Sequence, residues 1–255
     1  NPYGQKSEDE LLKIVDNAVK FLLKEDCKII VIACNTATTC CLKKLREMYP
    51  DTIFVGTVPA IKVAYDNNYK NTIILSTPYT MQSSRVEELI HNYRRKDQNI
   101  INISGENLAH LIELDNKIEI MSLLNRKLSK YKDVTDSLVL GCTHYPLIRK
   151  TVGRIIGDGV TLVNPAYETA KELEQLLISR NLMNPGTKAP VKEPYRFFVS
   201  DAADKFKNFF GCLLKTGGRN DPFAKGFDGS AACYLARLVT AHAVTDNEQA
   251  CVFGS

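Results

Sequence analysis

The chain has 255 residues, of which 44% are apolar and 24% charged, and its formal net charge is +4 at pH 7. These proportions are those of an ordinary globular protein, long enough for one large domain or two smaller ones. No apolar stretch approaches the ~18–20 residues of a membrane span. The scattered basic residues do not form the stripe typical of a nucleic-acid groove. Residues 1–5 have none of the features of a signal peptide, and we expect none.

The eight cysteines show no Cys-x-x-Cys pair and no paired Cys/His spacing of the kind that binds zinc. Several lie inside apolar runs, as reduced core cysteines do. A disulfide framework is not expected in a chain of this size, which favours a reducing cytoplasm as its location. We therefore expect no metal site.

In chain order, the sequence predicts helices that alternate with strands. Ser7 and Glu10 form a capping box, and the apolar residues after it recur with helical spacing as far as Leu22. The predicted strands are residues 28–33, 52–55, 71–75, 99–103, 137–140, 160–163 and 196–199. The longer helices predicted after the first are residues 36–48, 82–93, 118–131 and 167–178, and residues 76–78 are a predicted turn. This alternation predicts parallel α/β sheets.

Two of these strands end in the same way. Residues 29–36 and 137–144 each contain an apolar run, then a small residue, then Cys34 or Cys142, and then polar groups that include Thr. The carboxyl ends of strands carry the ligand site in open α/β sheets. Two equivalent thiols that face one cleft suit a reaction that is symmetric about a single atom. Removal of a proton from one face of a carbon, with its return to the other face, is such a reaction.

Two cysteine strands predict two sheets that face a cleft, and the chain then has to cross between them. Pro59 and the Asn164–Pro165 step are the candidate crossovers. They divide the chain into a first domain of residues 1–58 plus 165–255 and a second domain of residues 59–164. Residues 215–225 are rich in Gly, Lys and Asp and are typical of an exposed linker.

Residues 33–38 (Ala-Cys-Asn-Thr-Ala-Thr) and 141–146 (Gly-Cys-Thr-His-Tyr-Pro) resemble the two catalytic cysteine motifs of the glutamate racemases. The resemblance covers roughly residues 1–210, and the second hexapeptide favours glutamate racemases over the related aspartate racemases. Further similar segments are residues 2–4, 56–60, 76–77, 164–170 and 197–200. The resemblance implies an α/β fold with two similar parallel-sheet domains, flavodoxin-like halves, that face a central cleft.

The order of the segments differs from that of the family, whose members begin with a strand and an Asp-Ser-Gly loop. Something similar stands here near the other end of the chain, at residues 226–230 and 250–255. This pattern predicts a circularly permuted chain in which residues 227–255 supply the family's first strands. Chain termini often lie close together, so a short bridge between the old ends is physically reasonable.

The resemblance also implies a mechanism and its residues. A thiolate and a thiol on opposite faces of Cα exchange roles with the direction of reaction, without pyridoxal phosphate or another cofactor. Cys34 and Cys142 both follow a strand and precede a helix, where backbone N–H groups favour a thiolate. By resemblance, Asp228 assists Cys34, while His144 and Glu113 assist Cys142.

Neutral hydrogen-bond donors suit a zwitterionic substrate with an extra carboxylate. The predicted substrate-binding residues are Pro2, Tyr3, Gly4, Asn35, Thr36, Thr143 and Ser230. The Asn and Thr side chains also suit helix N-capping, and residues 2–4 also suit a simple turn.

The resulting hypothesis is a cofactor-independent glutamate racemase that supplies D-glutamate for peptidoglycan. Its partner is the small-molecule substrate, with no direct nucleic-acid or membrane contact, and the resemblance is compatible with a homodimer. One alternative is a racemase or isomerase of aspartate or another small dicarboxylate. A second alternative is a weakly active or inactive binding protein of the same fold, linked to DNA gyrase. The two intact cysteines favour an enzyme.

Overall fold

The structure is a computed structural model that describes residues 3, 6–93, 95–183, 198 and 249–253, the last as backbone only. Its strands form two sheets, one of three strands in the order β2-β1-β7 and one of four strands in the order β4-β3-β5-β6. All described strand pairs are parallel. The α/β prediction with two parallel sheets is therefore confirmed.

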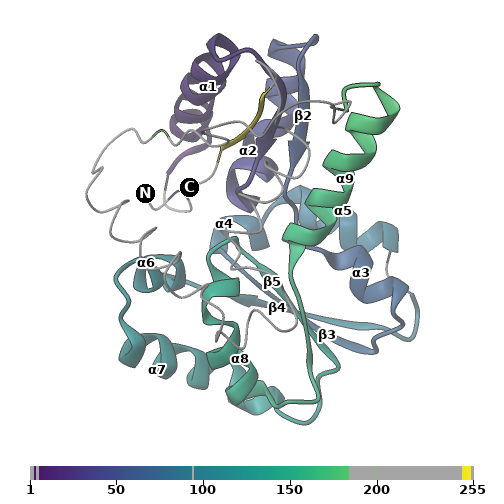
Figure 1. Cartoon of the computed structure of the whole chain (residues 1–255). Coiled ribbons are helices and arrows are strands. Elements are labelled where there is room, and N and C mark those ends of the chain that lie inside the picture. The colour runs from purple at the N-terminus through teal and green to yellow at the C-terminus, as the bar shows by residue number, and fades with distance from the viewer. Residues whose placement is uncertain (1–2, 4–5, 94, 184–197, 199–248, 254–255) are drawn as a thin grey trace, which may run out of the picture.

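The first sheet consists of β1 (Cys27–Ile32), β2 (Ile53–Gly56) and β7 (Gln249–Phe253). Helices α1 (Glu8–Lys24) and α2 (Asn35–Met48) cover one face, and α9 (Pro165–Ser179) covers the other (Figure 1). Side chains of β1 alternate between these faces, because successive residues of a strand point to opposite sides. Ile30 and Ile32 pack with α1 and α2, whereas Ile29 and Val31 pack with α9.

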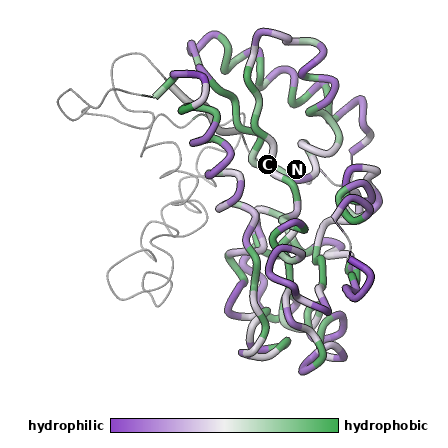
Figure 2. The backbone as a smooth tube through the Cα atoms, turned by 90° about the vertical axis from the view of Figure 1, so that its right-hand side faces the viewer, coloured by the Kyte–Doolittle hydropathy of each residue, from purple (hydrophilic) through white to green (hydrophobic). Residues whose placement is uncertain are grey.

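The second sheet consists of β3 (Asn71–Ser76), β4 (Asn99–Ser104), β5 (Ser137–Gly141) and β6 (Thr161–Val163). Its faces are covered in the same way. Leu75 and Leu140 pack toward the cluster that contains helices α6, α7 and α8, and Ile74 and Val139 pack toward α3 and α5. Figure 2 shows the result, with hydrophobic strands inside each half and hydrophilic segments outside. The helices are α3 (Ile61–Asp66), α4 (Pro78–Met81), α5 (Ser84–Tyr93), α6 (Leu108–Glu113), α7 (Lys117–Leu128) and α8 (Arg149–Ile156), with short 3₁₀ turns η2 (Ser129–Tyr131) and η3 (Tyr145–Ile148).

The chain crosses between the sheets after β2 and again after β6. The two crossovers lie close together, because the Thr169 hydroxyl donates to that of Thr57 at 3.3 Å. These are the crossovers that the sequence predicts. The assignment of residues 1–58 plus 165–255 and of residues 59–164 to two domains rests on them and remains a proposal.

Local signals in the sequence account for several element ends. The capping box is present, with the Ser7 hydroxyl accepting from Glu10 N–H and the Glu10 carboxylate accepting from Ser7 N–H. The predicted helix 82–93 corresponds to α5, which begins two residues later at Ser84, and the short helix α4 precedes it where no helix is predicted. Thr77 caps α4 with Pro78 at its first position, and the Ser83 hydroxyl accepts from Val86 N–H at the start of α5. Side-chain caps thus start two short helices where the sequence predicts one.

The strand β7 lies beside β1 in parallel register, with Val31 opposite Val252 (Figure 1, yellow). The permutation hypothesis expects a strand from this part of the sequence. Asp228 and Ser230, the predicted strand 196–199 apart from Phe198, and the predicted linker 215–225 lie outside the described residues. The permuted order itself therefore stays a prediction.

One expectation about the cysteines is wrong. Cys27 is disulfide-bonded, whereas Cys34, Cys40, Cys41 and Cys142 are free. A disulfide joins cysteines that the fold brings together, so spacing along the chain gave no signal for it.

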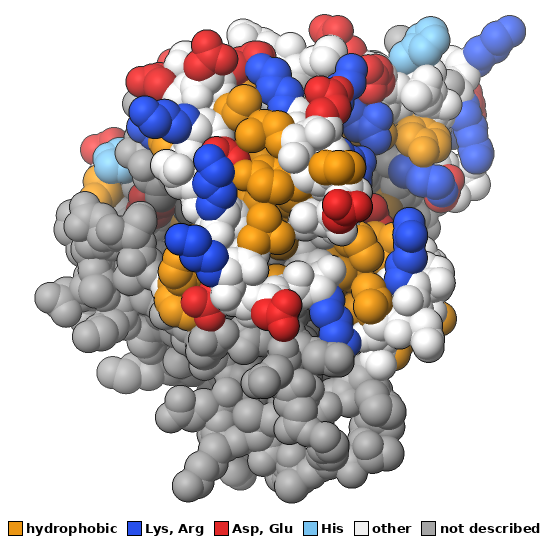
Figure 3. Space-filling model, turned by 90° about the horizontal axis from the view of Figure 1, so that it is seen from above, with side chains coloured by type: hydrophobic (Ala, Val, Ile, Leu, Met, Phe, Trp, Pro, Cys, Tyr) orange, Lys and Arg blue, Asp and Glu red, His pale blue; other side chains and the backbone are white. Residues whose placement is uncertain are grey.

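The outer face of the first domain carries a band of apolar side chains between charged ones (Figure 3). Exposed large apolar residues on the helices of this domain include Phe21, Met48 and Ile178. Within the part of the chain that the structure describes, no helix is both long and apolar enough to cross a membrane.

Candidate active site

Cys34 lies at the carboxyl end of β1 and is the N-cap residue of α2. Its side chain is 5% exposed, and its Sγ accepts a hydrogen bond from Ala37 N–H at 3.5 Å. The first turn of a helix presents unpaired N–H groups and the positive end of the helix dipole, which together favour a negative sulfur. The fold thus places the Cys34 sulfur at the amino end of α2, as the sequence predicts.

Cys142 follows β5 and is 7% exposed. Its Sγ lies 3.7 Å from Nδ1 of His144, and Nε2 of the same ring lies 3.0 Å from Oε1 of Glu113. The three residues predicted for this half of the site therefore form a chain of contacts that runs from Cys142 through His144 to Glu113. Glu113 ends α6, and His144 precedes η3.

The electrostatics of this line favour a charged imidazole. Burial alone would lower the pKa of His144, but its hydrogen bonds to Cys142 and Glu113 and their charges outweigh burial and raise that pKa to about 10. The hydrogen bond to His144 in turn lowers the pKa of Glu113. An imidazolium held by a carboxylate can give a proton to the adjacent sulfur and take it back.

A buried tyrosine supports the turn that carries Cys142. Tyr145 is 0% exposed, and its hydroxyl donates to the Gly105 carbonyl at 3.2 Å. A Cβ at Gly105 would lie 2.2 Å from that hydroxyl oxygen, so only glycine fits there. This packing fixes the loop from which His144 reaches Glu113.

A small cavity lies where the two halves meet, with a volume of about 10 Å³, which is room for roughly one water molecule. Its lining comes from both halves and from the second crossover: Asn35, Thr57, Cys142, Thr143, Pro146, Asn164, Pro165 and Ala166. Asn35 follows Cys34 directly, so the cavity brings the two cysteine motifs together. An amino acid needs more room than this cavity offers.

Asn35 is the most informative residue of this lining. Its side chain is 2% exposed, yet neither Nδ2 nor Oδ1 has a hydrogen-bond partner among the described residues. An unpaired buried amide costs roughly 1–3 kcal/mol, and native proteins rarely retain one without a function. Its donor and acceptor are therefore available to a polar ligand in the cavity.

Thr36 lies in a hydroxyl cluster that spans the two halves. Its Oγ1 is 3.1 Å from Oγ1 of Thr77 and 3.4 Å from Oγ1 of Thr80. Thr77 in turn donates to Thr80 at 2.9 Å. The sequence predicts a role for Thr36 but only a turn at residues 76–78, and it gives no role to Thr77 or Thr80. A Thr-x-x-Thr pair directly after a predicted strand was the available signal.

The structure places the remaining predicted substrate-binding residues differently. Thr143 lines the cavity. Tyr3 packs against the core cluster that contains Cys34 and Cys41, and burial together with these two thiols raises its pKa to about 12. The other candidates, Pro2, Gly4, Asp228 and Ser230, lie outside the described residues. Among the residues that are described, no group of three or more His, Cys, Asp or Glu side chains could hold a metal ion.

Comparisons with known proteins show the family to which the chain belongs. The sequence model of the Asp/Glu/Hydantoin racemase family matches residues 3–173. This chain belongs to that family. It is therefore an amino-acid racemase, an isomerase. The match ends before residues 227–255, which the permutation hypothesis needs.

Individual relatives and solved structures show which members of the family the chain resembles. The chain is 35% identical over 187 residues to a glutamate racemase from Clostridium novyi, covering 72% of each chain. It is 36% identical to one from Clostridium kluyveri, covering 71% of this chain and 72% of the relative. Among solved structures, a glutamate racemase isoform from Bacillus anthracis has a TM-score of 0.73 at 27% identity, covering 84% of this chain and 80% of that one. The Francisella tularensis glutamate racemase in complex with D-glutamate has a TM-score of 0.71 at 27% identity, covering 85% and 80%.

Proposed function

We propose that this enzyme interconverts L- and D-glutamate by proton transfer between Cα and two thiols, without a cofactor. The observation that carries the proposal is the cavity onto which Cys142, backed by His144 and Glu113, and the unpaired amide of Asn35 both open. Relatives named glutamate racemase, one of them solved with D-glutamate, support the choice of substrate.

The proposed reaction keeps protons balanced. In one direction the Cys34 thiolate removes the α-proton, and the Cys142 thiol donates a proton to the opposite face of the resulting carbanion. In the other direction the two sulfurs exchange roles. To reset the enzyme, Cys34 releases the α-proton that it took, and His144 gives a proton to the Cys142 thiolate and recovers one from solvent, while Glu113 holds the ring in place. Asp228 is the proposed partner of Cys34.

Substrate recognition in this proposal uses neutral donors and acceptors. Asn35, Thr36 and Thr143 would bind the amino and carboxylate groups, and the backbone around Tyr3 with the Ser230 hydroxyl would complete the site. The carboxylates would meet the amino ends of helices, which favour anions. Binding of both carboxylates places Cα between the two sulfurs.

The biological role follows from the family resemblance. D-glutamate supplies peptidoglycan synthesis, and we propose that the enzyme acts in the cytoplasm. A homodimer is compatible with the proposal.

The test is a circular-dichroism assay of purified protein with L-glutamate or D-glutamate and no added cofactor. Loss of ellipticity toward zero from either enantiomer is the expected result. Faster conversion of aspartate would overturn the choice of substrate, and no conversion of either amino acid would overturn the proposal.

A further inference from the structure

The hydroxyl of Tyr145 joins two turns of the second half. The first turn follows β5 and carries Cys142 and His144, and the Tyr145 N–H closes it by donating to the Cys142 carbonyl at 3.0 Å. The second turn follows β4 and leads into α6, and its Gly105 carbonyl accepts from the Tyr145 hydroxyl at 3.2 Å. Glu113 is the last residue of α6. One bond therefore connects the turn that carries His144 to the helix that carries Glu113.

Helix α6 needs such an anchor. It has six residues, and its N-cap residue, Asn107, makes no side-chain capping hydrogen bond. A helix this short is not stable by itself, so contacts with the rest of the fold have to hold it. Gly105 makes three of them: its N–H donates to the Ser76 carbonyl at 2.7 Å, and its carbonyl accepts from Tyr145 and, at 3.1 Å, from Leu108 N–H, at the first residue of α6. Tyr145 is thus tied to the start of this helix.

The bond of Tyr145 is buried, whereas the contact between His144 and Glu113 is partly open to solvent. Tyr145 is 0% exposed, and its ring packs in a core cluster that contains Cys142 and residues of α6. The Glu113 side chain is 34% exposed, and solvent weakens contacts between charged groups at the surface. The buried bond is therefore the better fixed of the two. All these groups lie in the second half, so their arrangement does not depend on how the halves face each other.

We propose that Tyr145 is a positioning residue of this racemase. Its bond to the Gly105 carbonyl holds α6 against the turn after β5, so that Glu113 meets Nε2 of His144 while Nδ1 faces Cys142. Tyr145 acts through these two backbone segments, and its hydroxyl bonds to a carbonyl rather than to a reacting group. The inference rests on the proposed function, because that function gives the chain of contacts from Cys142 to Glu113 its role.

The position of Glu113 controls how firmly His144 holds its proton. Burial lowers the pKa of His144, but its hydrogen bonds to Cys142 and Glu113 and their charges raise that pKa to about 10. The pKa of Glu113 is lowered by its hydrogen bond to His144 and by the charges of His144 and His110. A neutral hydrogen bond corresponds to about a fivefold preference for the arrangement that contains it. Loss of the Tyr145 bond should therefore weaken proton binding by His144 by about two- to fivefold.

The test is an NMR titration of the histidine rings in Tyr145→Phe, which removes the hydroxyl and keeps the ring. Leu108 N–H still donates to the Gly105 carbonyl, so this carbonyl keeps a partner. We expect the titration midpoint of His144, identified by its absence in His144→Gln, to fall by about 0.3–0.7 pH unit. The alkaline limb of kcat/KM should move with it, with activity retained near pH 7 and about two- to fivefold lower activity above about pH 10. An unmoved midpoint would overturn the inference.

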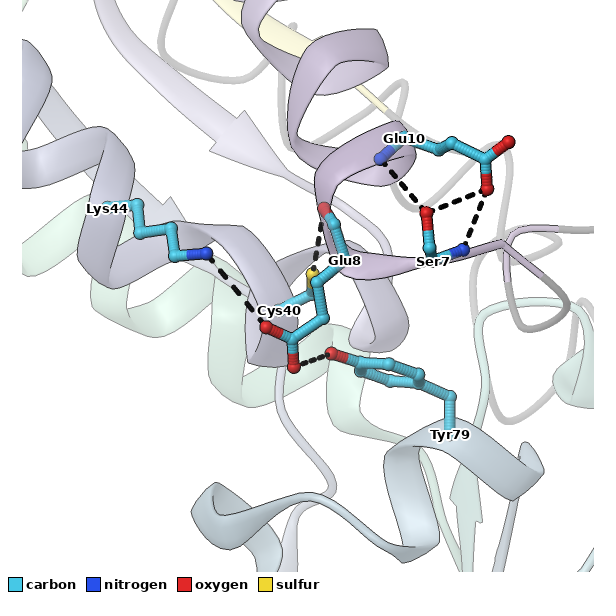
Figure 4. A network of polar contacts seen from close by, with 6 residues as sticks. All are labelled: Ser7, Glu8, Glu10, Cys40, Lys44 and Tyr79. Carbon is cyan, nitrogen blue, oxygen red and sulfur yellow. Dashed lines mark hydrogen bonds and ion pairs between the residues drawn. The ribbon is translucent and has the colours of Figure 1, made fainter.

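Two control variants separate positioning from stability. Tyr79→Phe removes another hydroxyl of the second half, which donates to Oε1 of Glu8 at 2.9 Å (Figure 4). Thr72→Val removes a buried hydroxyl that shares a hydrogen bond at the amino ends of β3 and β5, the edge of the sheet opposite the site. Thr72→Val should lower the melting temperature, and neither control should move the midpoint of His144. A movement in Thr72→Val as large as in Tyr145→Phe would mean a general loss of stability and would end the proposal.

A double variant tests the route through Glu113. If Tyr145 acts by placing Glu113, then Glu113→Gln combined with Tyr145→Phe should give the same His144 midpoint as Glu113→Gln alone. A further fall in the double variant would contradict this route. The titration needs no turnover. A folded parent protein that does not racemise glutamate would therefore overturn the proposed function, and the midpoint of His144 would still decide whether Tyr145 positions Glu113.

Discussion

His144 and Glu113 are separated by 31 positions in the sequence, yet Nε2 of the histidine lies 3.0 Å from Oε1 of the glutamate. This contact supplies part of the attraction that overcomes burial and raises the pKa of His144 to about 10. The ring is therefore charged at neutral pH, with its other nitrogen toward Cys142.

Glu113→Gln should lower the pKa of His144, because it removes the negative charge and leaves burial, which opposes the imidazolium. The alkaline limb of the kcat/KM profile should move to lower pH, with about a tenfold loss of activity near pH 8. A pH–rate series on both proteins measures this shift. An unmoved limb would show that Glu113 does not control the ring.

The same pair has a consequence for stability. The pKa of His144 in the folded protein, about 10, lies above the ~6.5 of a free imidazole. Its contribution to stability is fully present below about pH 6.5 and is lost as pH rises through about 10. Thermal unfolding of Glu113→Gln should depend less on pH over this interval than that of the parent.

Cys34→Ser and Cys142→Ser should each reduce racemisation by roughly 10²–10⁴-fold, because each removes one of two acid–base groups. The melting temperature should change little, since serine nearly matches cysteine in size. Each variant should still eliminate chloride from the enantiomer of β-chloroglutamate whose α-proton faces the remaining thiol, a step that needs only one base. Near-normal racemisation in either variant would contradict the two-thiol mechanism.

Asn35→Leu should separate binding from stability. The replacement removes a buried amide that has no partner among the described residues, so the melting temperature should stay equal or rise. Glutamate affinity should fall at least about tenfold, since the ligand would lose its partner. Calorimetric titration and thermal unfolding report the two effects.

Thr38→Val is the matched control on the same helix. The Thr38 hydroxyl is buried and donates to the Ile32 carbonyl at 3.0 Å. Its loss should lower the melting temperature while glutamate affinity is retained. If Asn35→Leu behaved like Thr38→Val, the Asn35 amide would be structural.

Sequence reasoning succeeded where the determinants are local. The Ser7–Glu10 capping box and the apolar strands before Cys34 and Cys142 depend on neighbouring residues, and the structure confirms them. The alternation of β1 side chains between two helical layers follows from the period of a strand.

Contacts between elements could not be predicted from local patterns, or were predicted only from the resemblance to the racemase family. The contacts of Thr36 with Thr77 and Thr80 depend on how two sheets face each other, which no local pattern reports. The four-residue helix α4 is too short to show a period. Glu113 was found only by resemblance, because its partner lies 31 positions away.

The racemase should be independent of bound cofactors. The purified protein should show no pyridoxal absorbance, and chelator treatment should leave its rate unchanged. Absorbance spectra and metal analysis of active protein measure this. A stoichiometric metal ion or pyridoxal phosphate that is needed for turnover would contradict thiol-only chemistry.

Ending the chain at Glu248 should destabilise the first domain. The strand β7 pairs with β1 over five registered positions, so its removal exposes the edge of the strand that leads into Cys34. We expect a lower melting temperature and loss of racemisation, while the second sheet, to which β7 does not belong, keeps its structure.

Ending the chain at Lys215 removes Asp228 as well, and its effect should be at least as severe. Asp228→Asn in the full chain isolates the carboxylate: if this residue assists Cys34, activity should fall with an unchanged melting temperature. A chain ending at Lys215 that stayed folded and active would show that the C-terminal segment is dispensable, and the permutation hypothesis would fail with it.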